Sequence, residues 1–292
     1  MVLTHTAERN GKLSGFLRRE LRLSMTLINR LKMQNAMFVN GNAVHADYPV
    51  VFGDVVSVRI EEEDPIYPAE EGELPILYED EALIAIDKPA DLLIHPSRTR
   101  NTGTLANRLA HYYKTTGQKC AVHPVSRLDR DTFGVVLLAK NAHIHALMCA
   151  AHDAKTIRKT YQAAVWGFLP AEEGLIDLPI ARLDPMGLLR GVRDDGQPSQ
   201  TEYRVLRKEA RGSLVELRPL TGRTHQLRVH LSHLGCPVLG DPQYGTEASQ
   251  AWSLVHGLTG QQLCASSLSF PHPLTGEQIT LYSSRQVTLP ID

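Results

Sequence analysis

Residues 123 to 141 read His-Pro-Val-Ser-Arg-Leu-Asp-Arg-Asp-Thr-Phe-Gly-Val-Val-Leu-Leu-Ala-Lys-Asn, and the rest of the chain is organised around them. Asp129 lies at the centre, between Arg127 and Arg130. The apolar run 135–139 is too short for a helix and begins with β-branched residues, so we expect a buried strand there. Two interpretations stay open on this stretch alone. Either the strand holds a reactive carboxylate, or the loop is a turn whose Asp and Thr side chains bond only to local backbone.

Size and composition are those of an ordinary globular protein. The chain has 292 residues, 42% of them hydrophobic and 22% charged, which leaves room for two domains. No apolar run approaches the roughly 20 residues of a membrane span, and the first ten residues carry no secretory signal pattern. The four cysteines are scattered without a Cys-x-x-Cys pair. We therefore expect a cytoplasmic protein without a membrane anchor, a disulfide frame or a zinc site.

The charges are unevenly distributed along the chain. The formal net charge is −1, yet residues 61–81 hold ten acidic and no basic residues. Residues 11–40 hold six basic residues against one acidic residue, and residues 98–160 hold eleven against three. A phosphate backbone responds to the local field of a basic face, so these segments are compatible with an RNA partner. Any single cluster is equally compatible with ordinary solvated surface charge.

The first 60 residues predict a small α+β module. Residues 13–23 have apolar side chains at helical spacing, and Ser24 is a typical N-cap for a second helix over about 25–34. Asn40-Gly41 between short apolar pieces indicates a tight hairpin, and residues 55–60 predict a further strand. The helix pair, the Phe-Val-Asn-Gly-Asn-Ala-Val sequence and the Gly-Asp-Val strand resemble the S-four-like RNA-binding domain.

That resemblance implies an RNA-binding domain over residues 1–62. Its candidate RNA contacts are basic side chains on the two helices: Arg18, Arg19, Arg30 and Lys32. The following acidic, proline-containing residues 63–75 predict a linker, and residues 76–292 predict a second domain with strand-rich α+β character. In that domain we expect strands over 83–87, 159–167, 201–207 and 214–220, and helices over 105–113, 142–154 and 224–234. The last helix has Thr224 as its predicted cap and ends at Gly235.

Two more motifs accompany the Asp129 stretch. Lys159-Thr-Tyr161 begins a predicted strand, and Leu-Thr-Gly-Arg-Thr-His-Gln-Leu-Arg, residues 220–228, places Arg223 in a glycine-containing turn at a helix start. A cation at that place suits an anion, although an ordinary helix cap with surface arginines explains the motif equally well. The three motifs in this order resemble the RluA-type pseudouridine synthases, and the likeness continues through 234–241 and 268–277.

The resemblance implies a pseudouridine synthase fold with a central mixed, mainly antiparallel sheet. It makes Asp129 the catalytic carboxylate, Tyr161 the active-site tyrosine and Arg223 the arginine that pairs with Asp129. The implied reaction isomerises uridine in ribosomal or transfer RNA on a flipped-out nucleotide, in a monomer that uses no metal or other cofactor. The implied RNA contacts near the site are basic residues of the same motifs: Arg127, Arg130, Lys159 and Arg228.

Two positions depart from the family pattern. Ser126 stands where the family usually has His, and Phe133 where it usually has Ser or Thr. Neither is the nucleophile, so they bear on substrate choice, through nucleotide contacts or an added stacking surface. They also keep open a catalytically inactive, RNA-binding relative. A third interpretation is a phosphatase of the haloacid-dehalogenase type, because Asp129-x-Asp131-x fits part of that pattern. There, however, the buried strand precedes the first Asp, whereas here the strand follows it.

Overall fold

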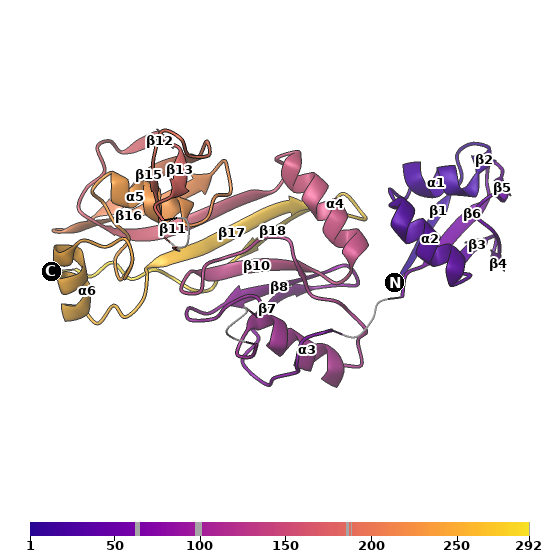
Figure 1. Cartoon of the computed structure of the whole chain (residues 1–292), viewed down its shortest axis with the longest axis horizontal. Helices are drawn as coiled ribbons and strands as arrows, with labels where there is room; N and C mark the ends of the chain where they lie inside the picture. The colour runs from indigo at the N-terminus through magenta and orange to yellow at the C-terminus, as the bar shows by residue number, and fades with distance from the viewer. Residues whose placement is uncertain (62–64, 97–100, 185–186, 188, 292) are drawn as a thin grey trace.

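The computed structural model describes residues 1–61, 65–96, 101–184, 187 and 189–291. A small N-terminal module lies beside an elongated domain built on one large sheet (Figure 1). Residues 62–64, where the predicted first domain ends and the linker begins, lie outside the described residues. The described part of the predicted linker, residues 65–75, forms no helix or strand. It also covers the large domain, since Tyr67 and Leu74 pack against the core under α3 (Leu105–Thr115).

The N-terminal module has its own hydrophobic core. Its four-stranded antiparallel sheet has the order β1-β6-β3-β4, and apolar side chains of both helices pack on that sheet. Ser24 caps the second helix through a bond from Leu27 N, 3.2 Å, as its sequence predicted. The elements are β1 (Val2–Thr6), β2 (Gly11–Lys12), α1 (Leu13–Arg19), α2 (Met25–Met33), β3 (Met37–Val39), β4 (Asn42–Ala43), β5 (Pro49–Val50) and β6 (Val55–Arg59).

The large domain is organised on a ten-stranded sheet. Eight strands follow the order β12-β15-β16-β11-β17-β10-β8-β7, with β18 beside β17 and β9 beside β10. Every pair in it is antiparallel except β10 with β17, so the predicted mixed, mainly antiparallel sheet is confirmed. The strands are β7 (Ile76–Glu79), β8 (Leu83–Lys88), β9 (His123–Pro124), β10 (Phe133–Ala139), β11 (Arg158–Trp166), β12 (Glu173–Asp177), β15 (Gln200–Lys208), β16 (Gly212–Pro219), β17 (Leu263–Pro271) and β18 (Gln278–Tyr282).

Strand β10 is buried along its whole length because helices cover both of its faces. Val136 and Leu138 pack toward α3, whereas Val135 and Leu137 pack toward α4 (Ala142–Asp153). A strand covered on both faces has a continuous apolar run, which is the pattern that the sequence shows after Asp129. The parallel contact with β17 depends on Gly134, whose φ is +105°. A Cβ there would lie 2.4 Å from the Ala265 carbonyl oxygen.

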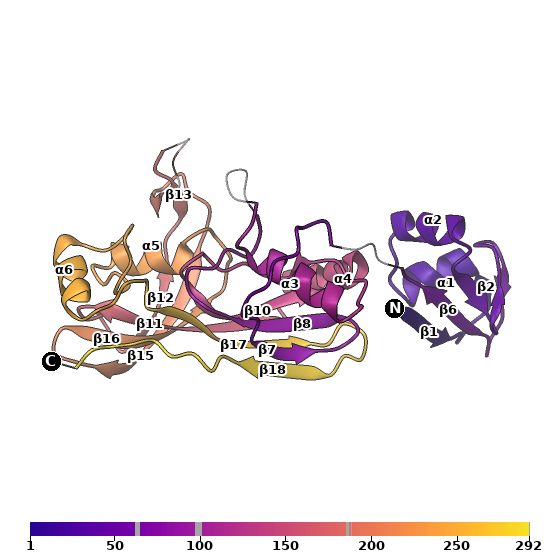
Figure 2. The same cartoon turned by 90° about the horizontal axis from the view of Figure 1, so that it is seen from below.

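The other half of the sheet supports two helices and a hairpin. α5 (Gln226–His233) packs its leucines on β11 and β16, and α6 (Glu247–Val255) lies near the C-terminus. The hairpin of β13 (Ile180–Arg182) and β14 (Arg190–Val192) projects from this half, away from the sheet (Figure 2). The prediction that Thr224 caps α5 is wrong: His225 is the N-cap, in a left-handed conformation with φ 57°. Gly235 does end the helix as predicted, with φ +75°.

Acid sensitivity is expected from His143, which lies buried on α4. Burial lowers the pKa of His143 from 6.5 to about 4. Between pH 6.5 and 4 the unfolded chain therefore binds a proton that the folded chain does not, and this group costs about 3 kcal/mol of stability as the pH falls through that window. We expect His143→Leu to remove this part of the pH dependence. Urea unfolding of both proteins at pH 7.5 and pH 4.5 measures it. An equal loss in the two proteins contradicts the assignment.

Candidate active site

The loop that carries Asp129 connects β9 to β10, and hydrogen bonds from other elements hold it at two positions. The buried ammonium of Lys88 donates to the carbonyl oxygens of Pro89, Leu92 and Arg130, at 2.9, 2.8 and 2.8 Å. Burial lowers the pKa of Lys88 to about 7, against the pull of the nearby Asp131 and Asp129 carboxylates. The backbone next to Asp129 is therefore fixed by the Lys88 side chain at the end of β8.

Two residues beyond Arg130 in the loop, Thr132 accepts a hydrogen bond of 2.5 Å from Gln261 Nε2. Both side chains are buried. Gln261 belongs to the segment that leads into β17, so the start of β10 is tied to the strand with which it pairs. Of the two interpretations of the Asp129 stretch, the held carboxylate fits these contacts better than a turn bonded only to its own backbone.

Asp129 pairs with Arg228 of α5. Arg228 Nη1 donates to Asp129 Oδ2 at 3.0 Å, while its Nε and Nη2 donate to the two oxygens of Asp241 at 2.7 and 2.8 Å. Gln243 Oε1 accepts a further bond of 2.8 Å from Nη2. The side chains of Arg228 and Asp241 are 5% and 0% exposed, whereas that of Asp129 is 31% exposed. One buried guanidinium thus joins an internal carboxylate to one that faces the solvent.

Two predictions about arginines are corrected here. Arg223 does not hold Asp129: it is exposed, and its Nε donates to the Pro198 carbonyl oxygen at 3.2 Å. Arg228 was predicted to contact RNA, which its burial and carboxylate partners contradict. The reason is where the helix begins. α5 starts at Gln226, so Arg228 projects from the first turn into the core, and Arg223 lies in the preceding loop.

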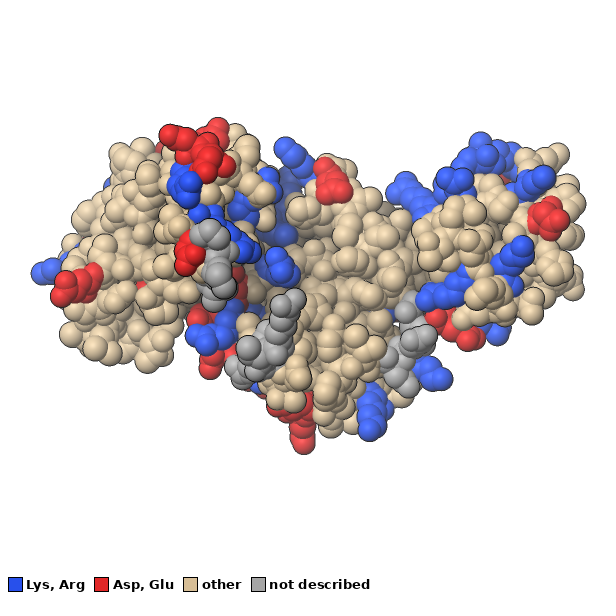
Figure 3. Space-filling view, viewed as in Figure 1, with Lys and Arg blue, Asp and Glu red and all other residues tan. Residues whose placement is uncertain are grey.

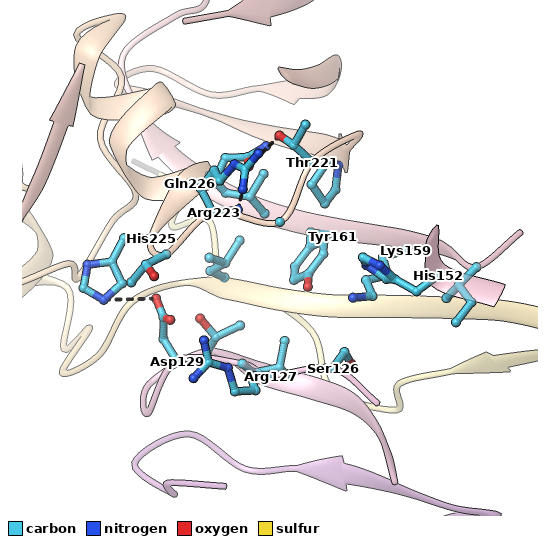
Figure 4. Close-up of a pocket in the computed structure, with 18 of the residues that line it drawn as sticks. Ser126, Arg127, Asp129, His152, Lys159, Tyr161, Thr221, Arg223, His225 and Gln226 are labelled. Carbon is cyan, nitrogen blue, oxygen red and sulfur yellow. Dashed lines mark hydrogen bonds and ion pairs between the residues drawn. The ribbon is translucent and has the colours of Figure 1, made fainter. Parts of the chain in front are cut away.

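Tyr161 lies on an irregularity of β11, where the register with β17 shifts between Thr160 and Gln162. Such a bulge re-aims a side chain out of the regular alternation. Figure 4 shows the Tyr161 ring between Asp129 and Lys159, with its hydroxyl pointing toward the side on which Asp129 and Arg127 lie. Burial raises the pKa of Tyr161 and the Asp129 carboxylate raises it further, so the phenol stays neutral.

These residues line one cleft of about 1390 Å³ between the two halves of the sheet. Its apolar floor includes Leu128, Leu227 and Leu263. Its rim is basic, and Figure 3 shows Lys and Arg side chains gathered along this hollow. Besides the buried Arg228, the Lys and Arg residues that line it are Arg127, Lys155, Arg158, Lys159, Arg182, Arg190, Arg218 and Arg223. Asp129 therefore lies in a basic cleft with an apolar floor.

The remaining predicted RNA contacts are distributed over two places. Arg127 and Lys159 line the cleft, where burial lowers the pKa of Lys159. Arg130 is exposed and pairs with Asp131 at 3.1 Å and Asp91 at 3.4 Å. In the N-terminal module, Arg18, Arg19 and Lys32 are exposed and Arg30 is half-buried. Lys32 lies with Lys12 in a second hollow of about 560 Å³.

The two departures from the family pattern occupy different environments. Ser126 lines the cleft, whereas Phe133 is 8% exposed and begins β10 in the core. Phe133 therefore adds little stacking surface.

Three residues at the site were not predicted from the sequence: His225, Asp241 and Tyr244. His225 lies inside the motif that carries Arg228, so its position was the available signal. Within the described ranges, no three metal-binding side chains cluster, and no helix has the length and apolar character that a membrane crossing requires.

The model of the RNA pseudouridylate synthase family matches residues 82–233, from β8 to the end of α5. The chain belongs to this family. It is therefore an RNA pseudouridine synthase, an isomerase, and the phosphatase interpretation is excluded. This synthase is 37% identical over 282 residues to YhcT, an uncharacterized RNA pseudouridine synthase of Bacillus subtilis (strain 168), a match that covers 95% of this chain and 91% of the relative.

Two relatives with named substrates are also similar. Ribosomal large subunit pseudouridine synthase C of Vibrio cholerae is 30% identical, over 95% of this chain and 90% of the relative. Ribosomal large subunit pseudouridine synthase D of Vibrio parahaemolyticus is 35% identical, over 84% of this chain and 78% of the relative. Among solved structures, human RNA pseudouridylate synthase domain containing 1 aligns with a TM-score of 0.61 at 25% identity, over 75% of this chain and 86% of that one. The RluA-type resemblance and the fold expected from it are confirmed.

The buried pair predicts a large difference between the two arginines. Arg228→Met leaves Asp241 buried without its cation, and we expect the free energy of unfolding to fall by about 3–5 kcal/mol. For Arg228→Lys we expect a loss of stability between those of Arg228→Met and Arg223→Gln, because one ammonium cannot reproduce the bidentate contact with Asp241. Arg223→Gln, the matched control, should change stability by less than about 0.5 kcal/mol. Urea unfolding measures all three. A larger loss for Arg223→Gln than for Arg228→Met contradicts this account.

Proposed function

We propose that the synthase converts specific uridines of ribosomal or transfer RNA to pseudouridine, with Asp129 as the catalytic carboxylate acting on a nucleotide rotated out of its helix. The observation that carries the proposal is the Asp129–Arg228 pair of 3.0 Å in a cleft with a basic rim. The cytoplasmic location and the monomeric state stay predictions from the sequence, as does the division at residues 62 and 75.

The reaction explains why a carboxylate stands at this place. The N1–C1′ bond of uridine breaks and a C5–C1′ bond forms, while one proton leaves C5 and one is taken up at N1, so nothing is oxidised. Such an exchange suits a group that carries negative charge and can bind the reacting nucleotide and leave again. Arg228 donates to Asp129 and fixes the direction of its carboxylate. The side chain of Asp129 nevertheless stays 31% exposed and so remains accessible from the cleft.

The cleft has the features needed for an extruded base. Its apolar floor and the Tyr161 ring offer surfaces on which a uracil can stack, and a neutral phenol keeps negative charge away from the base. Around them, the cationic rim suits the phosphates on either side of the target nucleotide. A base inside a helix cannot reach a carboxylate at this depth, so we infer that the nucleotide is flipped out.

Two observations bear on the RNA, the first on its class and the second on how it is held. The relatives with named substrates are ribosomal large subunit synthases, which favours ribosomal RNA over transfer RNA. The N-terminal module presents exposed cations on both of its helices, as a phosphate-binding surface requires. We infer that this module holds structured RNA near the target and that the cleft selects the nucleotide.

Replacing Asp129 tests the catalytic role. Asp129→Asn keeps the size of the side chain and one acceptor oxygen for Arg228 but removes the charge, so we expect pseudouridine formation to fall below detection while RNA affinity is retained. The measurement is a pseudouridine map of unmodified ribosomal and transfer RNA after incubation with the protein.

The matched control is Asp131→Asn, two residues along the same loop, where the carboxylate pairs with Arg130. It should stay active. An active Asp129→Asn protein sinks the proposal. If the unaltered protein binds RNA tightly and forms no product, it is an inactive RNA-binding relative.

Salt dependence tests the N-terminal module in the intact chain. We expect Arg18→Gln with Lys32→Gln to weaken binding of structured RNA and to reduce the slope of log affinity against log salt by about 2, because each cation removed leaves one phosphate without its partner. Lys114→Gln with Lys119→Gln removes the same charge from exposed positions on and after α3 and serves as the control. Equal effects of the two pairs contradict a specific role for the module.

A further inference from the structure

Tyr244 contacts both groups that face Asp129. It lies between Asp241 and α6, and its hydroxyl is 2.8 Å from His225 Nδ1. Its ring lies under the Arg228 guanidinium, 4.8 Å from centroid to Cζ, and meets the His225 ring edge-on at 5.6 Å. His225 Nε2 in turn lies 3.9 Å from Asp129 Oδ2, the oxygen that Arg228 also contacts (Figure 4). One phenol therefore supports the two nitrogen groups on the same carboxylate oxygen.

The hydrogen bonds decide where the proton of His225 lies. The backbone N–H of Arg190 donates to the Tyr244 oxygen at 3.0 Å, and an N–H can only donate. The hydroxyl proton of Tyr244 is then available for Nδ1 of His225. When the hydroxyl donates to Nδ1, the ring proton of the neutral imidazole is on Nε2, the nitrogen that faces Asp129.

Burial of the His225 ring favours this neutral form. Burial lowers the pKa of His225, Arg228 and Arg190 lower it further, and Asp129 and Asp241 act in the opposite direction. A neutral ring faces Asp129 with one N–H and adds no second full cation. The 3.9 Å separation is longer than a hydrogen bond, so the N–H orients the carboxylate when the two groups draw closer, as catalytic contacts do on substrate binding.

The backbone of His225 offers no reason for an imidazole. This residue has φ 57° and makes no side-chain cap bond to α5. Left-handed backbone is unfavourable for most non-glycine residues, and glycine or asparagine adopts it more readily. A purely structural N-cap at this position is therefore served better by either of those residues than by histidine.

We propose that His225 and Tyr244 are positioning residues for Asp129, with Tyr244 fixing the tautomer of His225 so that its Nε2–H directs the carboxylate. The inference rests on the proposed role of Asp129. It also links Asp129 to the hairpin, because the proton-fixing bond to Tyr244 comes from Arg190 of β14. The hairpin side chains Arg182 and Arg190 line the cleft, so this series of contacts runs from the rim of the cleft to its carboxylate.

Substitutions at residue 225 separate positioning from backbone fit. The amide nitrogen of a glutamine reaches the place of Nε2, whereas that of an asparagine reaches the place of Nδ1. We expect kcat of His225→Gln to stay within about tenfold of the unaltered protein, and kcat of His225→Asn and His225→Gly to fall about 100-fold, at similar KM. The melting temperatures should follow the reverse order, with Gly and Asn at or above Gln. An activity order that follows the stability order overturns the proposal.

Tyr244→Phe supplies a second test that keeps the ring under Arg228. We expect kcat to fall about tenfold with little change in KM or melting temperature. Tyr282→Phe on the exposed edge of β18 is the control and should be unaltered. Unchanged kcat in Tyr244→Phe overturns the tautomer role. The outcome is separable from the proposed function: an active Asp129→Asn protein sinks both, whereas an inactive one with the wrong order at residue 225 sinks only this inference.

Discussion

One buried guanidinium determines the geometry of the active site. Arg228 makes two bonds to the fully buried Asp241 and one to the half-exposed Asp129, so the position of the reactive carboxylate is set from the interior. An isolated buried cation is costly, and Asp241 offsets that cost before Asp129 is counted. The site therefore does not depend on Asp129 to hold its own partner in place. Asp129 can stay partly exposed because the two bonds to Asp241 already hold Arg228 in place.

Much of this arrangement was predictable from local sequence, and the rest depended on contacts between distant residues. The run after Asp129 is apolar at every position because α3 and α4 cover opposite faces of β10, so the buried strand was predictable. Strand β17 has the sequence Leu-Cys-Ala-Ser-Ser-Leu-Ser-Phe-Pro, with small and polar residues that show no clear period, and it was not predicted. Arg223 and Arg228 share one motif, and only the start of α5 at Gln226 decides which of them faces inward.

The two departures from the family pattern also required the fold. Phe133 follows the charged loop, which suggested an exposed ring, but its register opposite Cys264 places it in the core. Ser126 keeps a place in the cleft, so a shorter side chain there leaves more room on the side of Arg127. Of the two departures, the one at Ser126 is the one that lines the cleft. Gly134, next to Phe133, allows the close parallel contact of β10 with β17.

That parallel contact also bears on the order in which the chain acquires its structure. β17 lies between β10 and β11, so among the described strands the pairing between the two halves of the large sheet runs through β17, which follows both β10 and β11 in sequence. During synthesis, the segments carrying Asp129, Tyr161 and Arg228 all leave the ribosome before the strand that connects their supports. The N-terminal module, with its own core, needs no later segment and can fold first. Pairings across such sequence distances form slowly. We therefore expect the synthase to gain its active site late in folding, after its proposed RNA-holding domain.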